Sequence, residues 1–366
     1  MKTRWEISAA QAGLLAAGAV AMTGHALAAT QFIAAGGRDA WLGGLAALPF
    51  GLLAVWSLYR LGQRFPGQTL TEYLPQLLGY AGYVVGAVYI AYFYLAAIFT
   101  LRNTTDWLVD SILPETPSWV TGGLYLAAVL YSARGGLDVL ARVNQFTLAL
   151  VTAFGIFVSI GTGHGKDYGL LLPVLQHGFG PLLAVTLLEV GYLGELSILA
   201  QFHPYVVREE RAKAWRWYVA ALLFAVVTSV GPVAGAIATF GYRTAQNMTH
   251  PTFKQWLMVS FARFFERTDL MAVHQWLAGT YVREALFLLL ASHGLVQFSR
   301  RRIQLVRVLP IASLGIWLTA ELAFPNKPIL DAFLIGVYLP LSAVLGSFLP
   351  PLLLLIAVLR RAGTAP

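Results

Sequence analysis

Four charged residues, Glu189, Glu195, Arg283 and Glu284, stand inside two long apolar stretches of this chain. A charged side chain at the centre of a bilayer costs about 2.5–3.5 kcal/mol on insertion scales, so such groups face a protein interior or a wet cavity, usually with a partner. The sequence therefore predicts that Arg283 and Glu195 face one cavity, within reach of each other or of one shared ligand. Two interpretations are open: a structural ion pair between two helices, or a polar site for a charged or zwitterionic ligand.

The composition indicates that these apolar stretches lie in a membrane. Of the 366 residues, 58% are apolar and only 11% are charged, whereas an ordinary soluble domain carries about 25% charged residues. A soluble fold of this size cannot hide so much apolar surface. The composition therefore excludes a soluble enzyme, a disordered chain and a DNA-binding domain. The absence of Cys excludes disulfide scaffolds, thiol catalysis and thiolate metal sites.

The helices that must position these charges are predicted from ten apolar stretches, since a spanning helix needs about 20 mostly apolar residues. The predicted spans are 8–34, 41–59, 80–101, 118–133, 139–160, 179–203, 215–241, 270–298, 305–324 and 329–358. The first also resembles a signal peptide, but its apolar run continues past the supposed cleavage site at Ala26-Leu27-Ala28, which favours a span. We predict an all-α integral membrane protein with one multi-pass domain, 1–366.

The distribution of Lys and Arg predicts the orientation. With the N-terminus inside, the inner segments hold 16 of the 25 cations and the outer segments hold 8, four of them in the loop 242–269. Because cytoplasmic loops are enriched in Lys and Arg, both termini are predicted to be cytoplasmic. The net charge of +8 is then mostly a matter of topology.

The chain divides into two halves of five spans, pseudo-repeats of about 1–160 and 175–358, which must enter the membrane from opposite sides. The first span of each half is interrupted near mid-depth, by Thr23-Gly24-His25 and by Gly191-Tyr192-Leu193-Gly194. Interrupted helices in matching positions indicate a binding site at the bilayer midplane. The alternative is that these glycines serve close helix packing, which is common in membranes.

Other residues inside the spans carry weaker signals. His25 is either a hydrogen-bonded packing residue or a proton relay, and Tyr89 and Tyr92 either line a cavity or pack. Glu321 and Asp331 are expected to be solvated near span ends. The sequence lacks a zinc-protease motif, a P-loop and a nucleophile elbow. It therefore predicts no enzyme, no cofactor and no metal site.

A series of short motifs follows one order along the chain. They are Ile7-Ser8 with Gln11, Asp39-Ala40-Trp41, R-F-P-G-Q-T-L-T-E-Y at 64–73, L-P-E-T-P at 113–117, Ala141-Arg142-Val143, L-L-P-V-L at 171–175, Gly194-Glu195-Leu196, Pro204-Tyr205-Val206, Glu266-Arg267 with Asp269, and Phe324-Pro325-Asn326. In these motifs the chain resembles the spore germination protein GerAB family, the permease-like B subunits of endospore germinant receptors. The resemblance covers nearly the whole chain.

The resemblance implies an amino-acid/polyamine/organocation transporter-like (LeuT/APC-like) fold, a five-plus-five inverted repeat with broken helices 1 and 6. It implies a ligand pocket between spans 1, 3, 6 and 8. Glu195 falls on the family's Gly-Glu position and Arg283 on a position where the family carries a basic residue. The chain departs from the family in lacking a Pro soon after Gly24 and in having His250-Pro251-Thr252 where relatives usually have Tyr-Pro-Thr.

The function implied is a germinant-receptor B subunit that binds a small germinant, most simply an amino acid. The implied partners are a channel-forming A subunit, a C-subunit lipoprotein and the bilayer of the spore inner membrane or bacterial cytoplasmic membrane; no nucleic acid is expected. The alternative is a proton- or sodium-coupled amino-acid permease. The predicted ligand-binding residues are Thr23, Gly24, His25, Tyr89, Tyr92, Gly191, Tyr192, Gly194, Glu195, Arg283 and Glu284.

Overall fold

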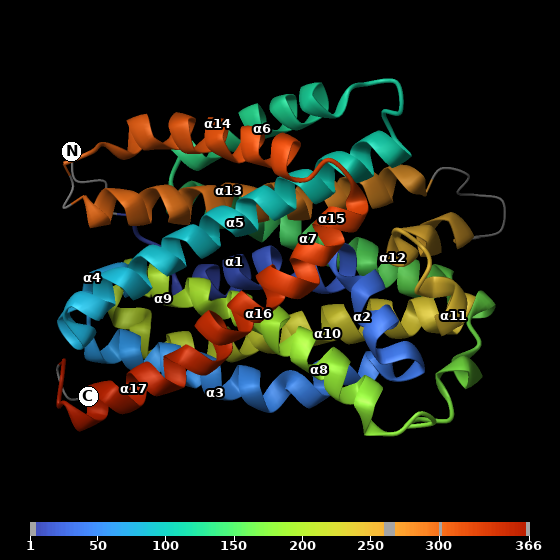
Figure 1. Ribbon diagram of the computed structural model, residues 1–366, viewed down its shortest axis with the longest axis horizontal. Helices are drawn as coiled ribbons and strands as arrows, with labels where there is room; N and C mark the ends of the chain where they lie inside the picture. The colour runs from blue at the N-terminus through green and yellow to red at the C-terminus, as the bar shows by residue number, and fades with distance from the viewer. Residues whose placement is uncertain (1–4, 260–267, 300–301, 364–366) are drawn as a thin grey trace.

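The computed structural model describes residues 5–259, 268–299 and 302–363, nearly all of them in helices that run along one long axis (Figure 1). Among these residues, seven helical runs are long and apolar enough to cross a membrane: Ala29–Arg64, Tyr80–Ser111, Leu137–Gly161, Phe179–Tyr205, Arg208–Phe240, Leu305–Ala323 and Lys327–Leu359. The remaining predicted spans are helical as well, as α1 (Ala9–Met22), α6 (Ser118–Arg134) and α13 (Asp269–Phe298). The all-α membrane fold is confirmed.

The other helices follow the predicted order of spans. They are α2 (Ala29–Gly36), α3 (Leu42–Arg64), α4 (Leu70–Leu78), α5 (Tyr80–Ser111), α7 (Leu137–Gly161), α8 (Phe179–Gly194), α9 (Ile198–Phe202), α10 (Ala214–Phe240), α11 (Tyr242–Ala245), α12 (Pro251–Lys254), α14 (Leu305–Ala323), α15 (Lys327–Phe333), α16 (Leu339–Ser342) and α17 (Leu349–Leu359). Span 1 consists of α1 and α2, span 6 of α8 and α9, and span 10 of α15 to α17. Spans 3, 5, 7 and 8 are α5, α7, α10 and α13.

Two of the sequence motifs start helices by side-chain capping. The Ser8 hydroxyl accepts a hydrogen bond from the Gln11 amide at 3.0 Å, and the Gln11 side chain accepts one from the Ser8 amide at 2.9 Å. Thr69 and Glu72 form the same reciprocal capping box at the start of α4. Because the first amides of a helix lack partners within it, each box satisfies two orphan donors.

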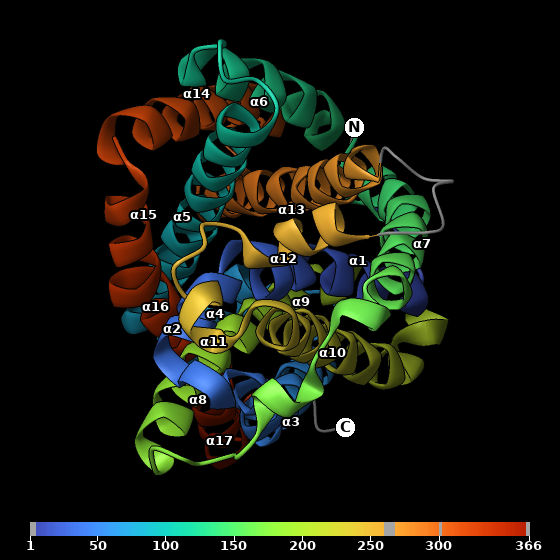
Figure 2. The same cartoon turned by 90° about the vertical axis from the view of Figure 1, so that its right-hand side faces the viewer.

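The helices form layers around α1. The helices α6 and α14 pack on each other and on α5 and α13 at one side of the bundle, whereas α3, α8 and α17 lie at the opposite side (Figure 2). The interior helix α1 packs against α7, α10 and α13. The start of α1 and the end of α17 lie at the same end of the bundle (Figure 1), as an even number of spans requires.

The first and sixth spans are both interrupted where the sequence predicts. In span 1, a π-helical turn covers Thr23–Leu27, and the chain leaves it through Ala28, with φ −121° and ψ 0°, into α2. In span 6, a 3-10 turn at Glu195–Ser197 separates α8 from α9. The broken helices 1 and 6 are therefore confirmed, although each break is a change of helix type and not a fully unwound segment.

Some expectations for charged residues near the span ends are wrong. The helix of the third span continues to Ser111, past its predicted end at 101, so Arg102 lies within this helix. Only 8% of Arg102 is exposed, and it forms ion pairs with Asp106 at 2.8 Å and Glu321 at 3.2 Å. Asp331 likewise pairs with Lys327. Glu321 and Asp331 are thus paired and not simply solvated, because charges so close to apolar surface favour a counter-ion.

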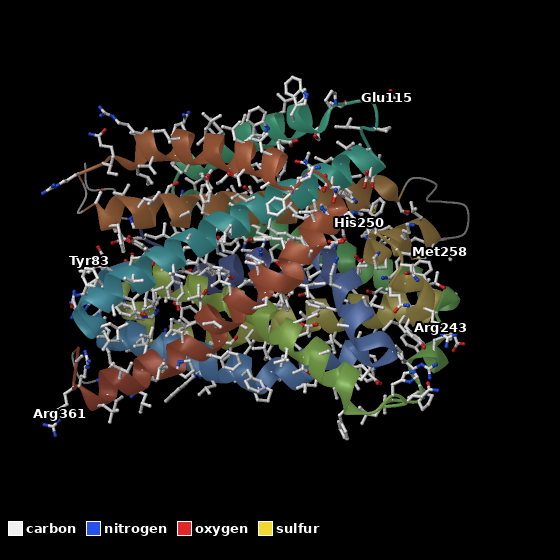
Figure 3. The ribbon with its side chains drawn as sticks, in the orientation of Figure 1. Tyr83, Glu115, Arg243, His250, Met258 and Arg361 are labelled. Atoms are coloured by element: carbon white, nitrogen blue, oxygen red, sulfur yellow. The ribbon has the colours of Figure 1, made fainter. Side chains whose placement is uncertain are left out.

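The Glu266-Arg267 motif and several of the cations counted for the orientation lie outside the described residues; these cations are Lys2, Arg4, Arg263, Arg267, Arg300 and Arg301. The connection after α10 is described up to Val259 and places His250 at the end of the bundle that also carries Glu115 and Arg243 (Figure 3). Arg361 lies at the opposite end.

Candidate functional site

The interruption in span 1 supplies backbone contacts to another helix. The Thr23 amide donates to the Val20 carbonyl, and the Ala28 amide donates to the Thr23 carbonyl. The Ala19 carbonyl accepts a hydrogen bond of 3.0 Å from Arg283 Nη1 on α13. Irregular helix within a membrane is tolerated where neighbouring groups satisfy its backbone, and here a charged side chain from span 8 does so.

The ion pair predicted from the sequence is present at this point. Arg283 Nη1 lies 2.6 Å from Glu195 Oε2, and Arg283 Nη2 lies 2.9 Å from Glu195 Oε1. Both side chains are fully buried, with 0% of each exposed. Two parallel N–H···O bonds between a guanidinium and a carboxylate form the strongest common geometry of an ion pair.

Three hydroxyl groups complete a closed network around this pair. Thr23 Oγ1 lies 2.9 and 3.0 Å from the two oxygens of Glu195, and the Tyr338 hydroxyl donates to Glu195 Oε1 at 2.7 Å. Arg283 Nε donates to Thr100 Oγ1 at 2.8 Å, and Arg283 Nη2 donates to the Tyr338 oxygen at 2.9 Å. We call Thr23, Thr100, Glu195, Arg283 and Tyr338 the polar centre; its residues come from spans 1, 3, 6, 8 and 10.

The polar centre has no spare donor on its cation. A guanidinium has five N–H groups, and those of Arg283 are all used by Ala19, Thr100, Glu195 and Tyr338. The predicted pocket between spans 1, 3, 6 and 8 is therefore filled, in this conformation, by protein groups that bind one another. A ligand enters it only by replacing some of these contacts.

The predicted glycines pack closely and do not require unusual backbone. Gly194 has φ −61° and ψ −21°, within the right-handed helical region, so it needs no glycine for its conformation. A Cβ atom on Gly194 would lie 2.2 Å from the Ser342 carbonyl oxygen, and one on Gly191 would lie 2.4 Å from that of Leu339. A Cβ on Gly24 would lie 2.6 Å from the ring of Tyr192. The packing interpretation of these glycines is thus the one that the geometry favours.

The predicted tyrosines lie around the polar centre. The Tyr92 ring stacks on Tyr338, with 5.7 Å between ring centroids, and its hydroxyl lies 2.8 Å from Ser342 Oγ. Tyr89 donates to the Leu345 carbonyl, and Tyr192 donates to the Ala225 carbonyl at 2.9 Å. All three rings are fully buried, and each hydroxyl has a partner, so they serve to fix span 10 and span 7 beside the centre.

The two further carboxyl groups are buried without a cation that binds them directly. Ser229 donates to one oxygen of Glu189, whereas the other oxygen has no partner within the described residues. Both oxygens of Glu284 are buried and also lack partners there. Burying a carboxyl group without a partner is costly, which sets these two groups apart from Glu195, whose oxygens are all hydrogen-bonded.

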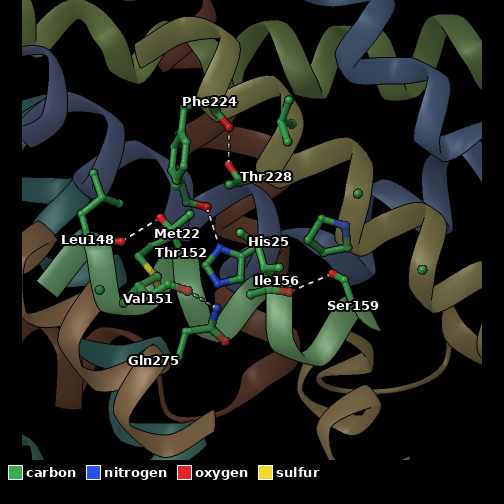
Figure 4. A pocket seen from close by; sticks show the side chains of 18 of the residues that line it. Met22, His25, Leu148, Val151, Thr152, Ile156, Ser159, Phe224, Thr228 and Gln275 are labelled. Carbon is green, nitrogen blue, oxygen red and sulfur yellow. Dashed lines mark hydrogen bonds between the residues drawn. The ribbon is translucent and has the colours of Figure 1, made fainter. Parts of the chain in front are cut away.

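A cavity of about 470 Å³ lies beside the polar centre, on the other side of helix α1. Spans 1, 5, 7 and 8 surround it, and its opening lies between α7 and α10, where Ile156 and Val227 are exposed. We call it the α7–α10 cavity. Of the predicted ligand-binding residues, only His25 lines it (Figure 4).

The sequence missed the cavity and two members of the polar centre. Thr100 and Tyr338 cannot be recognised from the sequence, because a single Thr or Tyr in an apolar helix is common. The cavity has a faint sequence signal, because Thr152, Gly155 and Ser159 repeat at helical spacing along one face of α7. Arg102 and Asp106, four residues apart, were a readable pair on a helix that extends beyond its apolar part.

Comparison with known proteins finds relatives along most of the chain. A family model described as spore germination protein matches residues 6–320. Spore germination protein XB of Bacillus anthracis is 27% identical over 354 residues, which cover 95% of this chain and 96% of the relative. Spore germination protein KB of Bacillus subtilis is 24% identical over 258 residues, which cover 69% of this chain and 68% of the relative.

Solved structures of transporters share the fold. MhsT in complex with L-phenylalanine superposes with a TM-score of 0.65 at 13% identity, covering 97% of this chain and 99% of that one. Mhp1, a nucleobase-cation-symport-1 family transporter with a bound hydantoin, gives a TM-score of 0.64 at 18% identity, covering 91% of this chain and 77% of that one. The fold is that of the LeuT-like transporters, as expected.

Proposed function

The chain belongs to the spore germination protein family, and from that premise we propose that it is the ligand-binding B subunit of a germinant receptor. It is a multi-pass, permease-like membrane protein, and its relatives by sequence and by fold are receptor- or transporter-like. One fold hosts both kinds of protein, so the proposal must depend on the site.

The observation that carries the proposal is the bidentate pair of Glu195 and Arg283, buried where spans 1 and 6 are interrupted. A zwitterion is the ligand class that can replace both partners together: its carboxylate takes the place of Glu195 on the guanidinium, and its ammonium group takes the place of Arg283 on the carboxylate. The neutral result avoids leaving either charge buried alone. An amino acid fits this description, and the complex of MhsT with L-phenylalanine supports it by analogy of fold.

The proposed site comprises the polar centre and the predicted residues around it. Thr23, Gly24 and His25 form the turn of span 1; Gly191, Tyr192 and Gly194 form the neighbouring stretch of span 6. Tyr89 and Tyr92 on span 3, with Glu284 beside Arg283, complete the surroundings. Opening of the centre would separate these elements, and a ligand that binds the open state better than the closed one would shift the population towards it.

The signalling partners are a channel-forming A subunit and a C-subunit lipoprotein, in the spore inner membrane, with both termini of this chain cytoplasmic. The proposed orientation has a direct test. A Cys introduced at Thr249 should react with an impermeant thiol reagent added from outside, and one at Ser299 should not; the reverse pattern would overturn the orientation.

The alternative is a proton- or sodium-coupled amino-acid permease, which the fold of MhsT and Mhp1 favours. Uptake of a labelled amino acid into proteoliposomes that contain this chain alone would support transport. Ligand binding without uptake, together with copurification of the A and C subunits, would support the receptor.

A thermal-shift screen of the purified chain tests the ligand class, because a ligand of the native state raises its melting temperature. We expect a shift with an amino acid and none with nucleosides or sugars. The double variant Glu195→Gln with Arg283→Met should fold but show a smaller shift, because the polar centre can no longer bind the ligand. The matched control neutralises another ion pair, Lys327→Met with Asp331→Asn, and should retain the full shift. A shift with a nucleoside or sugar alone would overturn the amino-acid proposal.

A further inference from the structure

The α7–α10 cavity is a second place where a small molecule fits, and its volume of about 470 Å³ is within the roughly 300–1,000 Å³ typical of ligand pockets. Most of its lining is apolar, including Met22, Leu148 and Phe224. It is separate from the polar centre, which faces the other side of α1. What binds there is decided by the few polar groups among the apolar ones.

Several polar groups that line the cavity offer hydrogen-bond acceptors. His25 Nδ1 lies 2.9 Å from the Ala21 carbonyl, which can only accept, so Nδ1 carries the proton and the neutral ring offers its Nε2 lone pair. Gln275 donates one N–H of its Nε2 group to the Val151 carbonyl at 3.1 Å, and its side-chain oxygen can accept a hydrogen bond (Figure 4).

The hydroxyl groups of the lining repeat this pattern. Thr152 donates to the Leu148 carbonyl at 2.7 Å, and Ser159 donates to the Gly155 carbonyl at 2.8 Å. Thr147 and Thr228 also donate to carbonyls of their own helices. Each oxygen therefore keeps its lone pairs for a ligand but has no proton left to give. These acceptors suit a group with several donors, such as an ammonium group.

A cation stands at one end of the same cavity. Lys166 lies in the connection after α7, and a Cβ on Gly235 would be 3.5 Å from its Nζ atom, which places the ammonium group against α10. Within the described part of the chain, this group has no hydrogen-bond or ion-pair partner. No Asp or Glu is among the described residues that line the cavity. An anionic group of the ligand is thus favoured near Lys166. A ligand that carries only a positive charge would find no acidic side chain among the described lining residues.

We propose that the α7–α10 cavity is a separate binding site for an amino acid with an apolar side chain. The ammonium group of the ligand binds the acceptors around His25 and Gln275, its carboxylate is bound by the flexible side chain of Lys166, and its side chain packs on the apolar lining. The inference shares its ligand class with the proposed function, but it stands on different residues and fails separately.

The position of the cavity gives its occupant an effect on the polar centre. His25 faces the cavity, and two residues earlier in the same π-helical turn Thr23 binds both oxygens of Glu195. A ligand that holds this turn in its present form stabilises the closed network behind it. Occupancy of the cavity and opening of the centre are therefore coupled, and the coupling acts equally in both directions.

The test is equilibrium binding of labelled leucine to the full chain in lipid nanodiscs. Gly231 lines the cavity, and apart from its two chain neighbours a Cβ there meets no atom within 4 Å, so Gly231→Leu adds a bulky side chain at the cavity. Gly336 on span 10 is equally open and lies outside the cavity, so Gly336→Leu is the matched control. We expect Gly231→Leu to remove one binding event per chain and Gly336→Leu to remove none.

The binding event that Gly231→Leu removes should survive Glu195→Gln with Arg283→Met, which separates it from the site of the proposed function. If Gly231→Leu removes nothing, the inference is wrong even where leucine binds at the polar centre. If Gly231→Leu abolishes all leucine binding, the inference is supported, and the polar centre is not the ligand site of the proposed function.

Two analogues test the roles of the charged groups. Isoamylamine lacks the carboxylate of leucine, and 4-methylpentanoate lacks its ammonium group; both should bind the cavity at least tenfold more weakly than leucine. Lys166→Met should weaken leucine about tenfold, the usual effect of losing one charged hydrogen bond, and leave isoamylamine unchanged. Lys254→Met, at a lysine outside the cavity lining, is the control. Equal binding of leucine and isoamylamine in the wild type would overturn the assignment of Lys166.

Discussion

The polar centre and the α7–α10 cavity lie on opposite sides of one turn of helix, and they differ in whether their polar groups have hydrogen-bond partners. In the centre, each donor of Arg283 has a partner, and both side chains of its ion pair have 0% exposed surface. In the cavity, His25 and Gln275 offer acceptors that face an open volume. In the first region the polar groups bind one another; in the second they face unoccupied volume. A buried ion pair therefore does not by itself mark a cavity that can hold a ligand.

The largest effect should come from breaking the pair in the polar centre. Arg283→Met leaves Glu195 buried alone, and removing one partner of a buried pair costs about 3–5 kcal/mol. We expect a large fall in the free energy of unfolding, measured by chemical denaturation in detergent. Adding Glu195→Gln should recover much of it, because no uncompensated charge remains. If Arg283→Met is as stable as the wild type, the ion pair does not stabilise the fold, and the contrast between the polar centre and the cavity is wrong.

The next effect compares two glycines that face the two regions. A Cβ on Gly194 meets the Ser342 carbonyl at 2.2 Å, whereas one on Gly231, apart from its chain neighbours, meets no atom within 4 Å. Gly194→Leu should destabilise the protein by at least about 1–3 kcal/mol, the usual range for overpacking. We expect reduced accumulation of that variant and normal accumulation of Gly231→Leu, measured as folded protein by size-exclusion chromatography. Equal accumulation of both would mean that spans 6 and 10 separate easily.

A third prediction concerns mild acid and a residue that belongs to neither region. Burial, and then the nearby cations Lys327 and Lys254, lower the pKa of His250 from 6.5 to about 3. Between these values the unfolded chain binds a proton that the folded chain does not. Stability should therefore fall as the pH decreases through this window, by about 1.4 kcal/mol per pH unit, which is about 2 kcal/mol by pH 5.

His250→Phe should remove this dependence, since the ring packs on Trp276 at 5.1 Å between centroids and an aromatic replacement keeps the packing. The measurement is the melting temperature from pH 5 to pH 7 in both proteins. A dependence that persists in His250→Phe would mean that another group is responsible and would contradict the prediction.

The smallest effect should be a gain. Gly231 lies in the helix α10 with open space at its Cβ position apart from its chain neighbours, and replacing Gly by Ala within a helix stabilises it by about 0.5–1 kcal/mol. The ring of Pro232 crowds the Cβ of the residue before it and offsets part of this gain. Gly231→Ala should raise the melting temperature slightly and leave leucine binding intact, because one methyl group occupies little of the cavity. A loss of stability would indicate that the open volume beside α10 is needed for folding.

The sequence was most informative where physical necessity leaves few options. Ten spans followed from apolar length alone, and Glu195 with Arg283 followed from the difficulty of leaving a charge unpaired in a membrane. The turn at Thr23–His25 was found because polar residues accompany a glycine there. The motifs Ile7-Ser8 with Gln11 and Thr69 to Glu72 are helix caps, and helix caps can be recognised from their spacing.

The rest depends on which helix faces are turned towards each other. Tyr338 joins the polar centre because span 10 lies close to span 6, which the glycines allow but do not predict. The cavity exists because α7 and α10 stand apart beside α1, and the small and polar residues on one face of α7 indicate this gap only weakly. Glu321 looked solvated because the extent of α5, with Arg102 on it, reaches beyond the apolar residues that mark a span.

One side chain ties five spans of this protein together. Arg283, carried by span 8, is hydrogen-bonded to Ala19 on span 1, Thr100 on span 3, Glu195 on span 6 and Tyr338 on span 10. If any one of these spans moves away, its hydrogen bond to Arg283 breaks while the other spans stay bound. Partial opening therefore costs hydrogen bonds without making room for a ligand. Such an arrangement makes opening an all-or-none event with a high activation barrier. A population of these molecules would answer a stimulus as individual switches that fire after a waiting time, and the strength of the stimulus would set how many fire and not how far each one opens.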